Sequence, residues 1–132
     1  MRSPENASRV FGRAARLARQ LAQVHGIPIA QYLQPSVWTR DLPVDDATLD
    51  NIGADREYHD TVAPGWNQAR ALMAVDGVVD LGDTLDGVDE LLYSDDVHMG
   101  ERGARLVAEA LYADLAPTLE RLHEEKAAAA PS

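Results

Sequence analysis

The feature that most constrains this chain is the small number of segments that could form β-strands. Residues 27–33 (IPIAQYL) are short, apolar and partly β-branched, and residues 76–81 (DGVVDL) form a second such segment. Helical patterns precede and separate the two segments, which is the order of elements in an α/β fold with parallel strands. A two-stranded sheet rarely stands alone. We therefore expect one part of a parallel α/β sheet, with its first strands missing from this chain.

Three stretches have the pattern of helices: residues 4–24, residues 56–74 with an interruption near Pro64, and a final helix from Glu101. Residues 36–55 are loop-like and acidic. We expect one partial domain over residues 1–126 and a disordered tail over residues 127–132. In the first helix an apolar stripe lies opposite a solvated face of four arginines; the stripe consists of Val10, Ala14, Leu17, Leu21 and Val24.

Charge and composition exclude several classes of function. The net charge of −10 opposes binding to nucleic acid or to an anionic membrane surface. Residues 1–26 carry five Arg and one Glu, whereas residues 41–101 carry sixteen acids and two Arg. The chain has no cysteine, so it forms no disulfide. No uninterrupted apolar run follows the basic start, so we expect neither a signal peptide nor a membrane span, and a soluble chain of unknown compartment.

The segment from Leu91 to Gly103 carries the residues with the clearest chemistry. Asp95 precedes His98 by three residues, on a loop between the second strand and the last helix. In doubly wound folds, sites gather beyond the carboxyl ends of the strands. Asp95 and His98 therefore lie where chemistry would be expected. The alternative is a polar loop that caps the last helix, since Asp and His both suit that position.

Asp95-x-x-His98, the following Gly103 and the Ala-rich last helix resemble the C-terminal block of SGNH/GDSL-type serine hydrolases. The Gly26-Ile27 to Gln34-Pro35 segment is similar to the fourth strand of that family, and residues 78–81 are similar to its fifth. The resemblance covers residues 5–122. It implies a flavodoxin-like parallel sheet flanked by helices, of which this chain supplies the C-terminal half.

The resemblance also implies hydrolysis of acyl esters, such as lipid or carbohydrate esters, without a cofactor. His98 would be the general base and Asp95 would orient it, with Asp96 as the rival acid. The Gly-Asp-Ser block that holds the family's nucleophile is absent, as are its oxyanion-hole blocks. The serine would have to come from elsewhere. The alternative function is a catalytically incomplete α/β module that acts by binding.

Other patterns favour ordinary structural roles. The acids at positions 80, 83, 86 and 89 recur every third residue, which does not fit a calcium-binding loop and indicates a solvated one. His25, His59 and His123 form no metal motif. Trp38 and Arg40 either line a substrate pocket or, for Trp38, pack in the core. Since the fourth strand would lack a neighbour, we expect its exposed edge to favour a homo-oligomer or a complementing chain.

Overall fold

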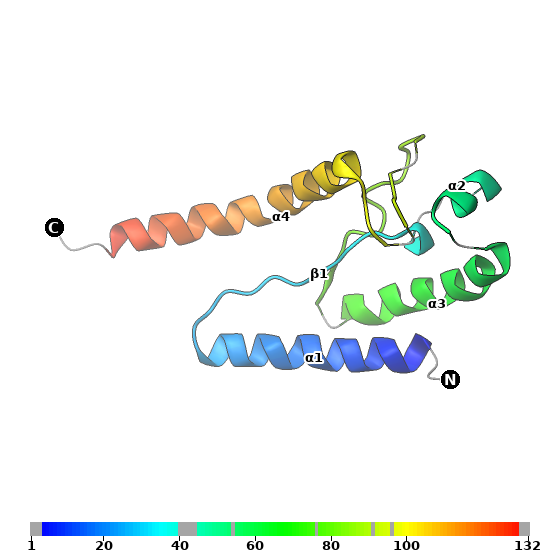
Figure 1. Cartoon of the computed structure of the whole chain (residues 1–132). Coiled ribbons are helices and arrows are strands. Elements are labelled where there is room, and N and C mark those ends of the chain that lie inside the picture. Colours follow the sequence, from blue (N-terminus) through cyan, green and yellow to red (C-terminus); the bar gives the residue numbers. More distant parts are fainter. Residues whose placement is uncertain are drawn as a thin grey trace.

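The computed structural model describes residues 4–39, 45–53, 55–75, 77–90, 92–95 and 97–129 (Figure 1). These residues form four α-helices, one 3-10 helix (η1) and two short strands. In chain order the elements are α1 (Pro4–Val24), β1 (Tyr32–Leu33), η1 (Val37–Thr39), α2 (Asp46–Asn51), α3 (Arg56–Val75), β2 (Val79–Asp80) and α4 (Glu101–Ala128).

The expected flavodoxin-like α/β sheet is wrong, because the described chain is mostly helical. The two strands lie within the predicted segments and pair in parallel, with Tyr32 opposite Val79 and Leu33 opposite Asp80. Each strand has only one partner in the described residues, and each spans only two residues. Parallel strands are stabilised by neighbours on both sides and by cover on both faces. With one neighbour, the ladder does not extend along the apolar segment before β1.

The buried apolar residues that the structure describes form two clusters. One lies between α1, α3 and the strands, where Ala15 meets Ala69, Met73 and Val78. α1 and α3 run side by side at this contact (Figure 1). The larger cluster joins η1, α2, the residues after β2 and the first turns of α4, and contains Val37, Trp38, Leu49, Ile52, Leu81, Leu85, Leu92, Tyr93 and Val107.

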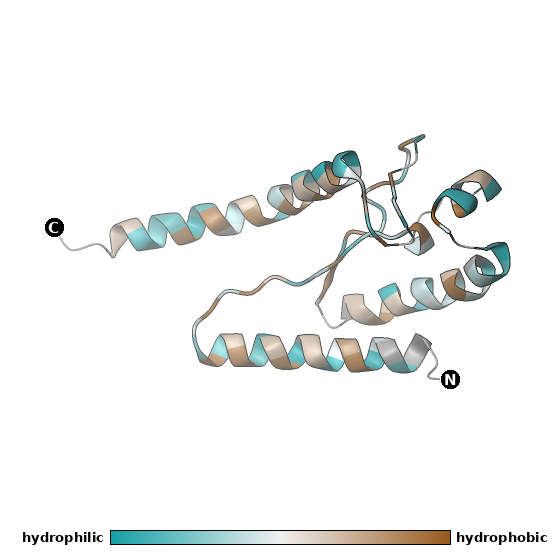
Figure 2. Ribbon diagram, viewed as in Figure 1, coloured by the Kyte–Doolittle hydropathy of each residue, from teal (hydrophilic) through white to brown (hydrophobic). Residues whose placement is uncertain are grey.

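The first helix packs through a face that the sequence pattern did not single out. Ser8, Gly12 and Ala15 are buried, since these small side chains let α1 approach α3 closely. The stripe of larger apolar residues is exposed instead, as are most of the arginines. Arg19 is the exception, because its guanidinium donates to Gln31 Oε1 at 3.0 Å. Figure 2 shows hydrophobic and hydrophilic residues alternating along α1.

Two local predictions need correction, and the two roles left open for Trp38 are decided. The segment expected as a loop contains η1 and α2, and the Asp45 carboxylate caps α2 by accepting from Thr48 N at 2.7 Å. Pro64, where an interruption was expected, lies inside a continuous α3. Trp38 is 3% exposed and packs edge-on against the ring of Tyr58, so it belongs to the core and not to a pocket.

Helix α4 packs on the rest of the chain mainly through its first half. Val107 is buried, and further along the phenol of Tyr32 donates to Asp114 Oδ2 at 2.6 Å. The second half borders a hollow beside the end of α1, and its last turns extend beyond that end (Figure 1). None of the described helices has the length and apolarity needed to span a membrane.

Candidate functional site

The loop before α4 is closed by short backbone contacts between its two ends. Tyr93 and Met99 form an antiparallel bridge, Ser94 N donates to His98 O at 2.8 Å, and Gly100 N donates to Leu92 O at 2.8 Å. These bonds bring the two ends of the loop together, with Asp95 and His98 between them. The loop therefore has a defined backbone although its tip is exposed.

Gly103 allows the first turn of α4 to lie directly against this loop. A Cβ atom at position 103 would stand 3.1 Å from the carbonyl oxygen of Leu92 and 3.1 Å from Met99 Cβ. Gly103 is buried, and Gly100 occupies the N-cap position of α4. The glycine of the predicted motif thus has a steric role, since a larger residue would push the helix away from the loop.

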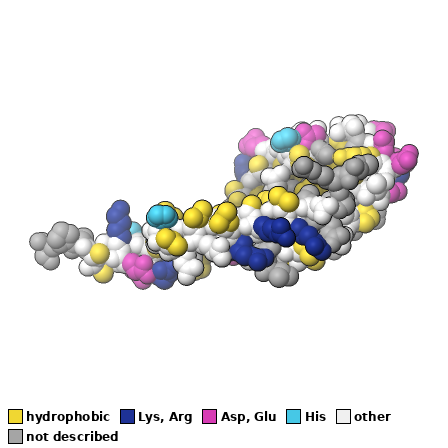
Figure 3. Space-filling view, turned by 90° about the horizontal axis from the view of Figure 1, so that it is seen from below, with side chains coloured by type: hydrophobic (Ala, Val, Ile, Leu, Met, Phe, Trp, Pro, Cys, Tyr) yellow, Lys and Arg dark blue, Asp and Glu magenta, His cyan; other side chains and the backbone are white. Residues whose placement is uncertain are grey.

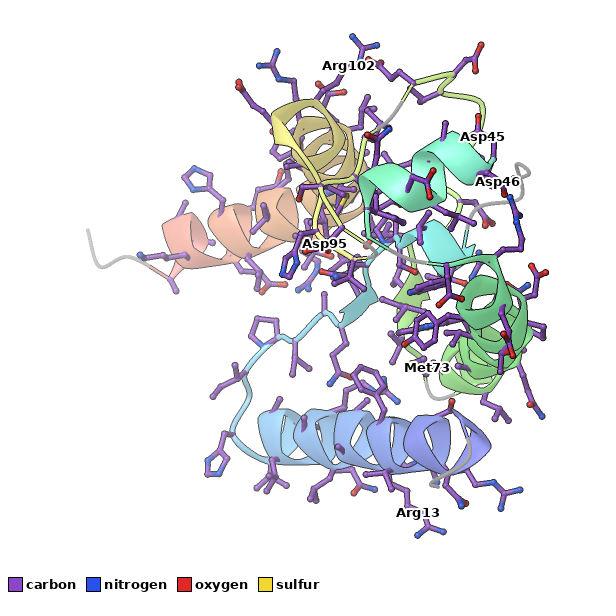
Figure 4. The ribbon with its side chains drawn as sticks, turned by 45° about the vertical axis from the view of Figure 1, so that its right-hand side comes forward. Arg13, Asp45, Asp46, Met73, Asp95 and Arg102 are labelled. Carbon is purple, nitrogen blue, oxygen red and sulfur yellow. The ribbon has the colours of Figure 1, made fainter. Side chains whose placement is uncertain are left out.

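Asp95 is held by three hydrogen bonds that use both of its carboxylate oxygens. Its Oδ1 accepts from Val97 N at 3.0 Å and from His98 N at 2.7 Å, which is an Asx turn. Its Oδ2 lies 2.7 Å from His98 Nδ1. The structure therefore brings together the two residues that the sequence singled out. Figure 4 labels Asp95 on the loop in front of α4.

These contacts favour the ionised carboxylate. The backbone N–H groups of Val97 and His98, followed by the His98 side chain, lower the pKa of Asp95 to about 2. A carboxylate facing Nδ1 accepts a hydrogen bond from an N–H there, which leaves the lone pair of a neutral imidazole on Nε2. The pair is thus arranged so that Nε2 can take a proton from a hydroxyl group or from water.

The pair is open to solvent. The His98 side chain is 76% exposed and that of Asp95 is 44% exposed. The nearest serine, Ser94, donates its hydroxyl to the backbone oxygen of His98 at 3.1 Å and not to the imidazole. Among the described residues, no hydroxyl group is hydrogen-bonded to the His98 ring.

Several other predicted residues contribute nothing to this site. Asp96, the rival acid, and Arg40 lie outside the described residues. His25 is exposed beyond the end of α1, and His123 is exposed on α4. His59 lies within α3. Within the ranges that the structure describes, no group of three or more His, Asp or Glu side chains is placed to hold a metal ion.

Sequence reasoning missed a cluster around Arg70, which joins three elements. Its Nε donates to Asp80 Oδ2 at 2.7 Å, a second nitrogen pairs with Asp83, and a third donates to the carbonyl of Thr39 at 3.1 Å. The Arg70 side chain is only 14% exposed. Two acids of the run expected to be solvated are therefore engaged in ion pairs. An arginine within an apolar stretch of α3 was the available signal.

Two hollows lined by described residues lie beside α4, and neither includes Asp95 or His98. One, of about 500 Å³, lies between the end of α1, the segment from Gly26 to Ile29 and the side chains of Arg121, Leu122 and Glu125. The other, of about 430 Å³, lies over the first turns of α4 at Glu101, Arg102, Arg105 and Leu106. Neither hollow therefore provides a substrate pocket for the acid–base pair.

Comparison with known proteins identifies no relative: no family model matches the sequence, and no curated protein or solved structure matches the chain.

Proposed function

We propose that the Asp95–His98 pair is the acid–base part of a hydrolase that cleaves acyl esters, by the Ser-His-Asp mechanism of SGNH/GDSL-type enzymes. The observation that carries this proposal is the 2.7 Å contact from His98 Nδ1 to Asp95 Oδ2, with the other carboxylate oxygen held by two backbone N–H groups. This is the relation of carboxylate to imidazole that a catalytic triad requires.

In this mechanism each residue has one task. Asp95 keeps the proton on Nδ1 and stabilises the imidazolium that forms during reaction. His98 Nε2 takes the proton of the attacking hydroxyl, and then returns it to the leaving alcohol. The lowered pKa of Asp95 supports this assignment, because the carboxylate stays charged throughout the neutral range.

The nucleophile has to be brought to the exposed side of His98. Ser8 and Ser36 are 4% and 2% exposed, and Ser94 is bonded to the loop backbone, so none of the three suits the role. We propose that a complementing chain provides the hydroxyl and the oxyanion donors, and that the substrate is a small ester of a lipid or a carbohydrate. An exposed Nε2 is compatible with such docking.

The first test is esterase activity of the purified chain on p-nitrophenyl acetate, with and without methanol as a small hydroxyl donor. We expect release of p-nitrophenolate that depends on His98 and increases with methanol. A positioned general base typically raises the reaction rate about 10²-fold or more. The rate increase with methanol should be smaller, because a freely diffusing nucleophile is not oriented toward the ester. His98→Ala should abolish this activity, and His123→Ala, an exposed histidine on α4, should leave it unchanged.

A second measurement tests the geometry without any nucleophile. In ¹⁵N NMR of the imidazole ring at a pH where His98 is neutral, we expect the proton on Nδ1 in the wild-type chain. Asp95→Asn should shift the tautomer population toward the Nε2–H form. Equal ester hydrolysis by the wild-type and His98→Ala chains, together with an Nε2–H tautomer in the wild type, would overturn the proposal.

A binding module without catalytic activity is the second candidate. The observation that favours it is the exposure of the pair, since His98 is 76% exposed and lies outside both hollows. In that case Asp95 serves as the turn residue of the loop before α4, and His98 is a surface residue. The same His98→Ala comparison separates the two candidates, because a binding module shows no activity that depends on His98.

A further inference from the structure

The outer side of α1 is an unpartnered apolar stripe. Val10, Leu17, Leu21 and Val24 are 67%, 56%, 54% and 79% exposed. With Ala14 they recur at intervals of four and three residues, which is the spacing of a coiled-coil seam. Side chains of this size are normally buried in such a seam. A contiguous exposed stripe of this kind marks an interaction surface.

The arginines of α1 decide what kind of surface fits this stripe. Arg9, Arg13 and Arg16 lie along one edge of it and are exposed. Viewed from below, dark-blue and yellow side chains lie next to each other over α1 (Figure 3), and Arg13 points away from the other helices (Figure 4). Packing α1 against a second α1 would bring arginines together, so a complementary surface has to be acidic.

The second half of α4 has the matching properties. Tyr112 and Leu119 are 68% and 51% exposed, and with Leu115 and Leu122 they recur at intervals of three, four and three residues. Glu109, Glu120 and Glu124 are exposed along one edge of this row. From Tyr112 to Glu125 the helix carries four acids and one arginine. Tyr112 and Leu119 are open to solvent, and the last turns of α4 extend beyond the end of α1, so another chain can reach this row (Figure 1).

From this complementarity we propose that the chain forms a homodimer in which α1 of each copy packs on the second half of α4 of the other copy. Each copy carries one basic and one acidic apolar stripe. A two-fold axis therefore pairs both stripes of one copy with both stripes of the other. The dimer buries the apolar residues of α1 and α4 and places Arg9, Arg13 and Arg16 opposite glutamates. This inference is independent of the proposed hydrolase activity.

Charge reversal provides a sharp test by sedimentation equilibrium at low ionic strength. One variant carries Arg13→Glu and Arg16→Glu in α1, and the other carries Glu120→Arg and Glu124→Arg in α4. The wild-type chain should be a dimer. Each variant alone should be mainly monomeric, because like charges then meet at both contacts. An equimolar mixture of the two should form a heterodimer, because both of its contacts pair opposite charges.

The control is Asp50→Arg on α2, an exposed reversal outside both stripes, which should leave the dimer intact. Far-UV circular dichroism shows whether each variant keeps its helices, and a variant that loses them is replaced by its single-substitution form. The proposal would be overturned if the wild-type chain were still a monomer in sedimentation equilibrium at 100-fold the protein concentration used in the esterase assay. A dimer that survives both reversals would also overturn it, since association would then use another surface.

Discussion

In both the loop around Asp95 and the cluster around Arg70, an aspartate binds a backbone N–H with one carboxylate oxygen and a side chain with the other. Asp95 Oδ1 accepts from Val97 N at 3.0 Å, and Asp80 Oδ1 accepts from Gly82 N at 2.8 Å. In each case the second oxygen binds a side chain. For Asp95 that partner is His98, three residues away and exposed, whereas for Asp80 it is Arg70, ten residues away on α3 and largely buried.

This difference separates a chemical role from a structural one. The Asp95–His98 contact forms within one turn of chain and is exposed to water, where such a contact contributes little to stability. Arg70 joins α3 to the residues after β2 and to η1, and its surroundings screen the charges less. We therefore expect the Arg70 cluster to stabilise the fold and the Asp95–His98 pair to be available for chemistry.

Arg70→Ala should have the largest effect on the free energy of unfolding. The substitution leaves Asp80 and Asp83 close together without their cation and removes the bond to the Thr39 carbonyl. We expect the free energy of unfolding to fall by about 2 kcal/mol, as for the loss of one partner from a partly buried network. Chemical denaturation measures this value.

Arg56→Ala is the matched control for that substitution, because the Arg56–Asp46 pair has side chains 45% and 85% exposed. It should leave the denaturation midpoint nearly unchanged. If the two arginine substitutions had equal effects, the contrast between buried and exposed pairs would be wrong.

Tyr32→Phe tests whether burial or separation along the chain determines how much a side-chain contact stabilises the fold. The Tyr32–Asp114 hydrogen bond joins residues 82 apart but lies at an exposed position. If burial determines how much such a bond stabilises the fold, Tyr32→Phe should lower the free energy of unfolding by less than Arg70→Ala does, by about 1 kcal/mol or below. Denaturation under the same conditions provides the comparison, and a larger loss than for Arg70→Ala would show that the tie between β1 and α4 matters more.

The same tyrosine provides a test at high pH. Partial burial, with the Asp114 carboxylate as acceptor, raises the pKa of Tyr32 to about 12. The folded state therefore favours the neutral phenol. Its contribution to stability is fully present below about pH 10, the unfolded value, and is lost as the pH rises through 12. Ultraviolet titration should show a late ionisation step that Tyr32→Phe removes.

The smallest expected effect on stability comes from the protonation of Asp95 at low pH. Its pKa of about 2 lies below the unfolded value of about 4. The contribution of this group is therefore present above about pH 4 and is lost as the pH falls toward 2. Carboxyl ¹³C NMR of Asp95 between pH 1.5 and pH 6 should give this low midpoint. A midpoint near 4 would mean that the Asx turn and the His98 contact do not form in solution.

Local chemistry made part of the structure predictable from the sequence. The predicted starts of α1 at Pro4 and of α4 at Glu101 agree with the structure, because both depend on residues within one helical turn. Asp95 and His98 were singled out for the same reason, since a spacing of three residues allows the carboxylate to reach the ring. The cap at Asp45 was also a local signal, but the acidic composition around it was interpreted as a loop.

Tertiary structure alone decided which surfaces are covered. The sequence shows that α1 has an apolar stripe and an arginine face, but the helix packs on α3 through Ser8, Gly12 and Ala15, because small side chains permit close approach. It likewise shows acids at positions 80 and 83, but only folding brings Arg70 to them. Periodicity and capping depend on neighbours a few residues away, so the sequence by itself determined the three long helices and the Asp95–His98 spacing. Burial and ion pairing depend on which elements meet, so only the fold decided the extent of the sheet, the partners of Arg70 and the exposed side of α1.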